Sequence, residues 1–208
     1  MPHNHSRLGR LFVLSAPSGS GKSAVEELVF SQLPELVYSV SYTTRGPRPG
    51  ETDGRSYNFI STDKFKAMVA DDQFLEWAEV FGRHYGTGRA WVESRLKAGH
   101  DVLADLDVDG AASVRRLMPE AVLIFMVPPT IGELRRRLAG RGTEIEEQIN
   151  LRLGRVQSEI DSRSIYDYLV INDNLNDAAT EIIDIIQNGR GRPMSERENF
   201  WPEFFAKK

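Results

Sequence analysis

The sequence contains no cysteine, which excludes disulfides, catalytic thiolates and zinc–thiolate sites. No apolar run approaches the roughly 20 residues that a membrane-spanning helix needs. The first ten residues, MPHNHSRLGR, carry no apolar stretch of the kind found in a secretory signal. A net charge of only −4 argues against non-specific binding to nucleic acid or membranes. We therefore expect a cytoplasmic protein without a nucleic-acid or membrane partner.

Short apolar runs alternate with helical patterns along the 208 residues, and 40% hydrophobic content is enough for a proper core. The runs of strand length lie at 11–15, 101–107, 121–127 and 167–173. This alternation predicts βαβ units, and continuous apolar strands are typical of a parallel sheet covered on both faces by helices. The predicted fold class is therefore α/β, with three layers around a central parallel sheet.

Two stretches depart from this alternation. Residues 39–99 are rich in aromatics, glycines and charges, which predicts an α+β insert with a small sheet of its own. Residues 130–158 predict two helices around the sequence AGRGTE. Each helix begins with a capping-box pattern, Thr130 with Glu133 and Thr143 with Glu146.

The segment APSGSGKS follows the first apolar run and precedes a helical pattern, as a P-loop requires, with Ala16 in place of the usual first glycine. In such a loop backbone N–H groups cradle phosphates, Lys22 places its charge on the β- and γ-phosphates, and the Ser23 hydroxyl binds Mg²⁺. A glycine-rich turn with a chance lysine is the alternative, but the flanking strand and helix favour a nucleotide site. The predicted ATP-binding residues of the loop are Ala16, Pro17, Ser18, Gly19, Ser20, Gly21, Lys22 and Ser23.

Two carboxylates, Asp105 and Asp107, end the run VLADLD. Strand periodicity puts both on one face, at the edge of the sheet where α/β proteins bind ligands. A solvated strand end is the alternative, but Mg²⁺–phosphate sites recruit such an aspartate. The spacing leaves open which of the two does what.

Two arginines, Arg45 and Arg48, stand three apart in TTRGPRPG, where Pro47 and Pro49 stiffen the backbone. A polyproline-II segment has about three residues per turn, so both guanidinium groups would face the same way. Such a pair suits a dianionic phosphate. An isolated motif of this kind would be a solvated turn. Beside a P-loop it indicates a phosphoryl acceptor that is itself a phosphate ester.

A second group of arginines lies in the helical stretch 130–158. Leu134 and Leu138 share one helix face and leave Arg137 and Arg141, four apart, on another, while Arg152 lies off the apolar stripe of the next helix. A solubilising hairpin is the alternative. A mobile lid that closes over transferring phosphates explains both the arginines and the glycines flanking Arg141.

These segments, taken in order, resemble the guanylate kinases. The matching sequences are the P-loop, SVSYTTRGPRPGETDGRSYNF, FLEWAEVFGRHYGTG, DVLADLDVDG, RRLAGRGTE and VINDN, from about residue 11 to about residue 187. The resemblance implies a P-loop NTPase fold and transfer of the γ-phosphoryl group of ATP to GMP, with Mg²⁺ as cofactor. It also implies a single domain at 8–190, followed by a tail. Its parts would be a core (8–38, 100–129, 159–190), a GMP-binding insert (39–99), a lid (130–158) and the tail at 191–208.

The resemblance also assigns residues to roles. The GMP-binding set is Ser41, Arg45, Arg48, Tyr57, Glu76, Tyr85, Gly86, Thr87 and Asp107. The catalytic set is Lys22, Arg45, Arg137, Arg141 and Arg152. Asn172 would contact the adenine side of ATP, and Ser23 would bind Mg²⁺ with Asp105 behind it. A carboxylate at Glu76 suits guanine, because guanine N1–H and N2 are donors whereas adenine N1 is an acceptor.

The sequence departs from the family pattern at two places. The usual DxQG is DVDG, so Asp109 replaces a glutamine, with an effect on affinity that stays open. The tail carries Phe200, Trp201, Phe204 and Phe205, which predict an apolar clasp on this chain or on a neighbour. Two other functions remain as alternatives: an inactive binding module of this family, and a P-loop kinase for another phosphorylated acceptor such as a ribose phosphate. Homo-oligomerisation also stays open.

Overall fold

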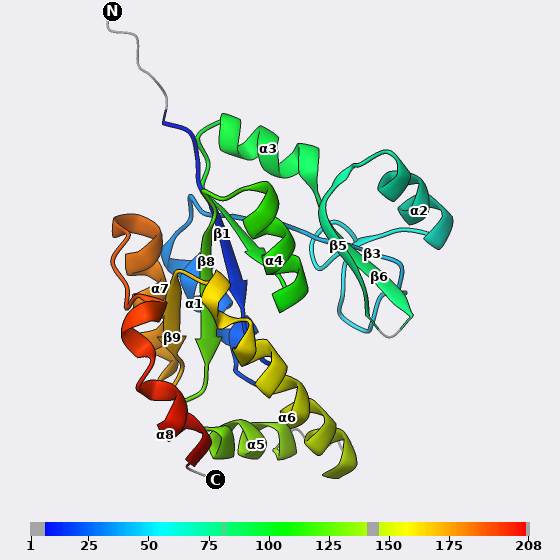
Figure 1. The fold of residues 1–208 in the computed structure, drawn as a ribbon. Helices are drawn as coiled ribbons and strands as arrows, with labels where there is room; N and C mark the ends of the chain where they lie inside the picture. The colour runs from blue at the N-terminus through cyan, green and yellow to red at the C-terminus, as the bar shows by residue number, and fades with distance from the viewer. Residues whose placement is uncertain (1–6, 81, 141–145, 207–208) are drawn as a thin grey trace, which may run out of the picture. The chain divides into compact units, whose positions relative to one another are not determined.

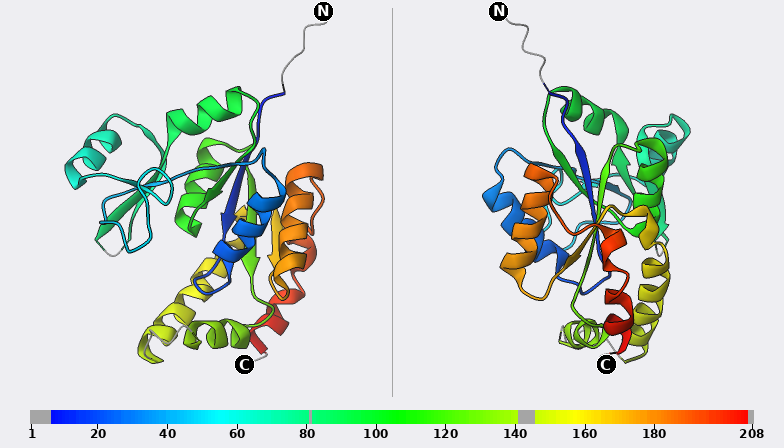
Figure 2. Two further views of the ribbon diagram at one scale, coloured as in Figure 1. Left: turned by 180° about the vertical axis from the view of Figure 1, so that it is seen from behind. Right: turned by 60° about the vertical axis from the view of Figure 1, so that its left-hand side comes forward.

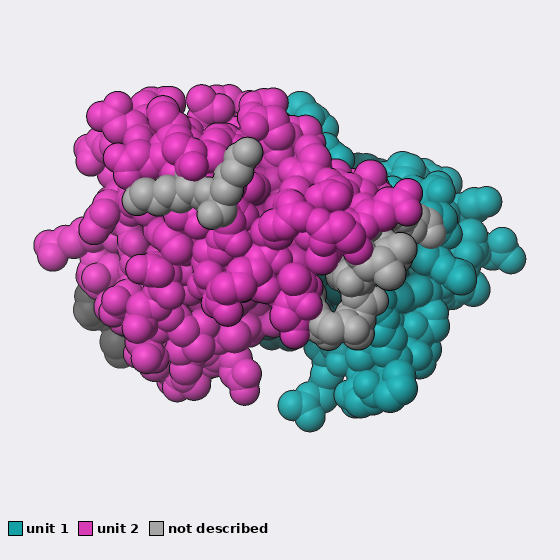
Figure 3. Space-filling model, turned by 90° about the horizontal axis from the view of Figure 1, so that it is seen from below, with its two compact units in different colours: residues 1–13, 35–121 teal, residues 14–34, 122–208 magenta. Residues whose placement is uncertain are grey.

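The structure is a computed structural model that describes residues 7–80, 82–140 and 146–206. The chain forms two compact units, which Figure 3 shows in different colours. Unit 1 comprises residues 1–13 and 35–121, and unit 2 comprises residues 14–34 and 122–208. Among the described residues no helix is both long and apolar enough to cross a membrane.

Most elements of unit 1 are labelled in Figure 1. Strand β1 (Leu11–Ser15) begins in this unit and ends in unit 2. The others are β2 (Val37–Tyr38), β3 (Tyr42–Thr43), β4 (Asn58–Phe59), α2 (Thr62–Ala70), β5 (Phe74–Val80), β6 (Arg83–Gly88), α3 (Arg89–Lys97), β7 (Val102–Asp105) and α4 (Val108–Leu117).

The elements of unit 2 are mostly helical. They are α1 (Lys22–Gln32), β8 (Val122–Val127), α5 (Ile131–Ala139), α6 (Glu146–Asp161), the 3₁₀ turn η1 (Arg163–Ile165), β9 (Tyr168–Ile171), α7 (Leu175–Asn188), the 3₁₀ turn η2 (Met194–Arg197) and α8 (Phe200–Ala206). Helices α1 and α7 lie side by side, as Figure 2 shows.

The main sheet has the strand order β2-β7-β1-β8-β9. β2 pairs in parallel with β7, and β8 pairs in parallel with β9. All five residues of β1 are buried, as a strand covered on both faces requires. The α/β class and the parallel sheet are confirmed, and the four predicted strands appear as β1, β7, β8 and β9.

A second sheet, in the order β4-β3-β6-β5, lies within the stretch 39–99. Helix α2 packs against this sheet and forms a small core with it. In this core Phe65 stacks on Phe74 with ring centroids 4.4 Å apart, and Met68 is buried beside them. The Ser61 hydroxyl caps α2 by accepting a hydrogen bond from the Lys64 N–H. The prediction of a separate small sheet in this stretch is therefore confirmed.

The tail folds onto its own chain. In α8, Trp201 is 5% exposed and Phe204 is completely buried, and the helix packs against α5. The segment before it pairs with the edge of β9, because Tyr168 and Pro193 form a bridge. Of the two predicted positions for the apolar clasp, the structure shows the one on this chain.

Candidate active site

The P-loop in unit 2 joins the buried end of β1 to the start of α1. Gly19 and Gly21 have φ values of +91° and +87°, which favour glycine. A Cβ on Gly21 would lie 2.7 Å from the Asn172 amide nitrogen, and one on Gly19 would lie 2.8 Å from a Leu138 methyl carbon. Both glycines are therefore required by backbone conformation and by space.

The first turn of α1 favours an anion. The helix begins at Lys22, its N-cap is Gly21, which has no side chain to cap the N–H groups, and the first turn contains no acidic residue. The N–H groups and the helix dipole at this end thus suit phosphate oxygens. The Ser23 side chain is exposed at the second position of the helix.

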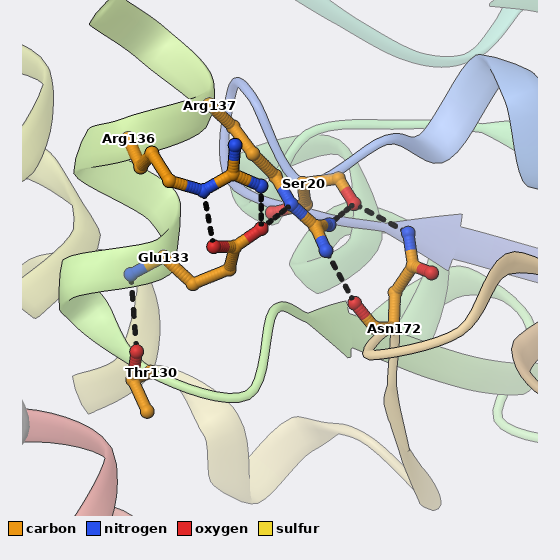
Figure 4. Close-up of polar contacts among 6 residues, drawn as sticks. All are labelled: Ser20, Thr130, Glu133, Arg136, Arg137 and Asn172. Atoms are coloured by element: carbon orange, nitrogen blue, oxygen red, sulfur yellow. Dashed lines mark hydrogen bonds and ion pairs between the residues drawn. The ribbon is translucent and has the colours of Figure 1, made fainter.

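Arg137 of α5 contacts the P-loop directly (Figure 4). Its Nη1 donates to the Ser20 carbonyl oxygen at 3.2 Å, and its Nη2 donates to the Asn172 carbonyl oxygen at 3.0 Å. The buried Asn172 side chain donates to the same Ser20 oxygen at 2.7 Å. The structure therefore places Arg137 and Asn172, predicted for lid and adenine contacts, against the loop backbone.

Glu133 holds the other edge of Arg137. One carboxylate oxygen accepts from Arg137 Nε at 2.7 Å, and both accept from Arg136 at 2.7 Å (Figure 4). These two arginines lower the pKa of Glu133 to about 2. The Thr130 hydroxyl caps α5 on the Glu133 N–H at 3.0 Å, as predicted. In a full capping box the Glu133 carboxylate would also accept from the Thr130 backbone N–H. Here the carboxylate binds Arg136 and Arg137 instead.

Two further arginines, Arg152 and Arg141, were predicted for the lid. Arg152, on α6, donates to the Ser18 hydroxyl of the P-loop. Arg141, like Thr143 of the second capping-box pattern, lies outside the described residues. Of the predicted lid set, Arg137 and Arg152 therefore both reach the loop in this structure.

A buried carboxylate in α1 was not anticipated from the sequence. Glu26, one turn after Lys22, is 8% exposed, and no described group hydrogen-bonds its Oε1. Burial raises the pKa of Glu26, while the Lys22 charge lowers it. The pattern EE in an amphipathic helix gave no signal that one of the two would point inward.

Three of the four predicted guanine residues, Ser41, Glu76 and Thr87, lie on or next to strands of the second sheet in unit 1. Glu76 and Thr87 face each other across β5 and β6, and the Thr87 hydroxyl donates to Glu76 Oε1 at 2.6 Å. Tyr42 pairs with Gly86, so the same antiparallel register continued by one residue places Ser41 opposite Thr87. Because cross-strand partners share a face of a sheet, Ser41, Thr87 and Glu76 form one row.

Glu76 lies in an unusual electrostatic environment. It is 8% exposed, and burial, with the nearby Asp107 charge, raises its pKa to about 7 against the stabilising hydrogen bond from Thr87. Gly110 leaves room for this arrangement, since a Cβ there would lie 3.0 Å from Glu76 Oε2 and 3.2 Å from Asp107 Oδ1. Gly110 is thus a site residue by virtue of having no side chain.

Asp107 is not a strand residue, contrary to the alternation prediction. β7 ends at Asp105, and Asp107 caps α4 by accepting from the Gly110 N–H at 2.8 Å. The chain turns between the two residues, so strand periodicity does not apply to the pair. Asp109 lies in the first turn of α4, where a negative charge stabilises the helix dipole.

The predicted phosphate residues of unit 1 cluster around Arg45. Its guanidinium lies 4.9 Å from the Tyr57 ring centre, and the rings of Tyr57 and Tyr85 meet edge-on at 6.0 Å. A bidentate pair with Glu51, both bonds 2.6 Å, orients Arg45 and raises its pKa. Glu51 also accepts from the Arg48 N–H at 2.7 Å.

Glu51 was missed by the sequence reasoning, which attributed the order of this loop to the prolines. The structure shows that a carboxylate also holds it, and Arg45 and the Arg48 N–H lower the pKa of Glu51 to about 2. The available signal was an acidic residue in an arginine loop. Glu133 was noted in the sequence as the capping-box partner of Thr130, which gave no indication that it would bind Arg137.

The donor groups present suit Mg²⁺ held mainly by substrate. Among the described residues no cluster of three or more His, Cys, Asp or Glu side chains could hold a metal. Mg²⁺ in nucleotide sites keeps waters and phosphate oxygens and takes few protein ligands. The exposed hydroxyl of Ser23, at the anion-binding end of α1, fits that chemistry.

A P-loop followed by its helix, on a parallel sheet, and a separate arginine and carboxylate receptor define a P-loop kinase class of nucleotide-binding protein. The family model described as guanylate kinase matches residues 8–189. The chain belongs to the guanylate kinase family.

Individual relatives agree with this family model. A guanylate kinase of Sphingopyxis alaskensis is 47% identical over 186 residues, covering 89% of this chain and 84% of the relative. One from Dechloromonas aromatica is 45% identical over 179 residues, covering 86% and 89%. The crystal structure of guanylate kinase from Anaplasma phagocytophilum superposes with a TM-score of 0.72 at 31% identity, covering 91% of this chain and 90% of that one.

Proposed function

We propose that this protein transfers the γ-phosphoryl group of ATP to GMP, forming ADP and GDP. The observation that carries the proposal is the buried Glu76 carboxylate held by Thr87, in a chain that also has a P-loop followed by its helix. A carboxylate in this position accepts from N1–H and N2 of guanine and meets a lone pair on N1 of adenine. Purine discrimination therefore rests on one side chain whose orientation is set by its neighbour.

In the acceptor site, Arg45 and Arg48 bind the GMP phosphate, with Tyr57 and Tyr85 as hydroxyl donors beside them. Glu51 holds Arg45 in a fixed orientation, so that little side-chain entropy is lost when phosphate binds. Ser41, Glu76, Thr87 and Asp107 bind the base, and Gly86 supplies backbone next to Thr87 on β6.

In the donor site, the P-loop N–H groups and Lys22 bind the phosphates of ATP. Arg137, Arg141 and Arg152 stabilise charge on the transferring group, and Asn172 lies beneath the loop. Ser23 would hold Mg²⁺, and the ion when bound would neutralise charge on the β- and γ-phosphate oxygens. No general base is required, because the attacking GMP phosphate is already an anion and positioning supplies most of the catalysis.

We propose one domain at 8–190 for this activity. Residues 39–99 are the GMP-binding insert, 130–158 the lid, and 191–208 a tail that contributes packing rather than chemistry. We expect the protein to act in the cytoplasm on soluble nucleotides.

A coupled assay with ATP, Mg²⁺ and each nucleoside monophosphate tests the proposal. We expect turnover with GMP and little with AMP, CMP or UMP. Binding of GMP without turnover would favour the inactive binding module, and turnover with a sugar phosphate alone would favour the other kinase. Equal rates with GMP and AMP would remove the role given to Glu76.

A further inference from the structure

Three acceptors surround the guanidinium group of Arg137, and each comes from a different part of unit 2. They are the Glu133 carboxylate one turn earlier on α5, the Ser20 carbonyl in the P-loop, and the Asn172 carbonyl that follows β9 (Figure 4). One planar side chain thereby connects the helix, the loop and the end of the strand. The flat, forked shape of arginine permits this, and a lysine ammonium could not make the same contacts in one plane.

The position of the Ser20 carbonyl matters for phosphate binding. It accepts both from Arg137 Nη1 at 3.2 Å and from the Asn172 side chain at 2.7 Å. A carbonyl held away from the phosphates leaves the N–H groups of the loop to point toward them, which is what an anion cradle requires. The contacts of Arg137 and Asn172 therefore favour the phosphate-binding form of the loop.

We propose that Glu133 is a positioning residue for the ATP-binding loop, acting through Arg137. Its carboxylate binds Arg137 Nε at 2.7 Å and so fixes the edge of the guanidinium that faces away from the loop. The remaining Arg137 nitrogens then face Ser20 and Asn172. The inference rests on the proposed function, since it assumes that the loop binds ATP.

The surroundings of the pair support this assignment over a purely local role. The side chains of Glu133 and Arg137 are 21% and 22% exposed, whereas Arg136, the other partner of Glu133, is 75% exposed. Charged hydrogen bonds shielded from water are stronger than exposed ion pairs. The bond to Arg137 is therefore the one with consequences for the site, and the bond to Arg136 serves as an internal comparison.

Binding of ADP with Mg²⁺ to the whole protein, followed by calorimetry, tests the proposal without needing GMP or turnover. We expect Glu133→Gln to raise the Kd for ADP about tenfold, the loss expected for one charged hydrogen bond. The KM for GMP should stay within a factor of about two of wild type, because the acceptor residues lie on other elements.

Two control variants separate positioning from helix stability. In the native protein the Thr130 hydroxyl caps α5 by accepting a hydrogen bond from the Glu133 N–H. Thr130→Ala removes this cap and should lower Tm without changing the Kd for ADP. Arg136→Ala removes only the exposed partner of Glu133 and should leave the Kd for ADP unchanged.

A double-mutant cycle then shows whether Glu133 acts through Arg137. In an Arg137→Ala background, Glu133→Gln should change the Kd for ADP by less than about twofold. A full tenfold effect in that background would overturn the proposal, as would an unchanged Kd in the single variant. Failure of the proposed function is a separate result, because it appears as a wild-type protein that binds ADP but does not phosphorylate GMP.

Discussion

Two glutamates, one from each unit, are held in opposite ways. In unit 2, Glu133 lies between two arginines, which lower its pKa to about 2. In unit 1, Glu76 is buried beside a threonine hydroxyl and near Asp107, and its pKa rises to about 7. The first carboxylate is charged at any physiological pH, and the second titrates near neutrality. The same residue type thus serves in two ways: Glu133 is a permanently charged structural residue beside the P-loop, and Glu76 is a guanine ligand whose charge changes near neutral pH.

The contrast teaches that the two half-sites solve different problems. On the donor side, which must hold a polyanion, two arginines neutralise Glu133. On the acceptor side, which must select a base that donates hydrogen bonds, the Glu76 carboxylate accepts from the Thr87 hydroxyl, and the ligand completes its hydrogen bonding. Each half should therefore fail separately, with a distinct kinetic signature.

The largest expected effect belongs to the P-loop lysine. Lys22→Ala should lower kcat about a thousandfold, because the charge it removes stabilises the transferring phosphoryl group. The KM for GMP should stay near its wild-type value. Steady-state kinetics with each nucleotide varied in turn measure both quantities. A comparable rise in the KM for GMP would mean that the two half-sites are not separable.

The next effect concerns the acceptor phosphate. Arg45→Ala should raise the KM for GMP about a hundredfold, since a bidentate charged contact is lost and Glu51 is left without its partner. The KM for ATP should be unchanged. An unaltered KM for GMP would contradict the assignment of Arg45 to the phosphate.

A smaller effect is expected from adding one methyl group. Gly110→Ala would place a Cβ 3.0 Å from Glu76 Oε2, so the carboxylate must shift and the KM for GMP should rise about tenfold. Gly154→Ala is the matched control, because it adds the same group to a helix where no atom of the described residues outside the local helix backbone lies within 4 Å of the new Cβ. The control should leave GMP binding unchanged, and equal behaviour of the two variants would count against the close packing at Gly110.

A further effect is a pH dependence of GMP binding, which only the acceptor side should show. Guanine binds the ionised form of Glu76, so GMP affinity should fall as pH drops below about 7, by at most about tenfold per pH unit. ADP affinity should lack the step centred near pH 7, because Glu133 stays ionised. In Glu76→Gln that step should also be lost from GMP binding, leaving only the titration of the nucleotide phosphate, whose second pKa is about 6. Calorimetric titrations with GMP at about six pH values, from about 5.5 to about 8.5, would measure this dependence.

The same group predicts a change in stability of opposite sign. The folded-state pKa of Glu76 lies above its ordinary value of 4.5, so the free energy of unfolding without ligand should fall as pH rises through the interval up to about 7. The expected loss is about 3 kcal/mol from the pKa difference alone. Denaturant unfolding of wild type and Glu76→Gln measures it, and parallel pH curves for the two would contradict the raised pKa.

The main elements and their order follow from local signals in the sequence. β1, β7, β8 and β9 were predicted from apolar runs, the P-loop from its glycines, and the start of α5 from Thr130. Each depends on residues that are neighbours in sequence. The short strand β2 (Val37–Tyr38) was not predicted, because two residues carry no periodicity.

The partners of charged side chains were harder to predict. Nothing near Arg137 in sequence indicates that its guanidinium contacts Ser20, 117 positions away, or that Glu133 holds it from behind. Likewise, the importance of Gly110 follows from the close approach of the Glu76 carboxylate, which comes from another element. These contacts depend on side-chain directions in three dimensions, and sequence spacing constrains such directions only within one helix or strand.

The sequence by itself thus determined the α/β class, the phosphate loop and the arginine and carboxylate types that guanine and phosphate require. These are properties of composition, periodicity and short motifs. The tertiary structure decided which carboxylate is paired and which is left to the ligand, since burial and distant neighbours set the charge of Glu76 and Glu133. The pKa of an acidic side chain shifts with its surroundings in the folded protein, and the two half-sites differ for that reason.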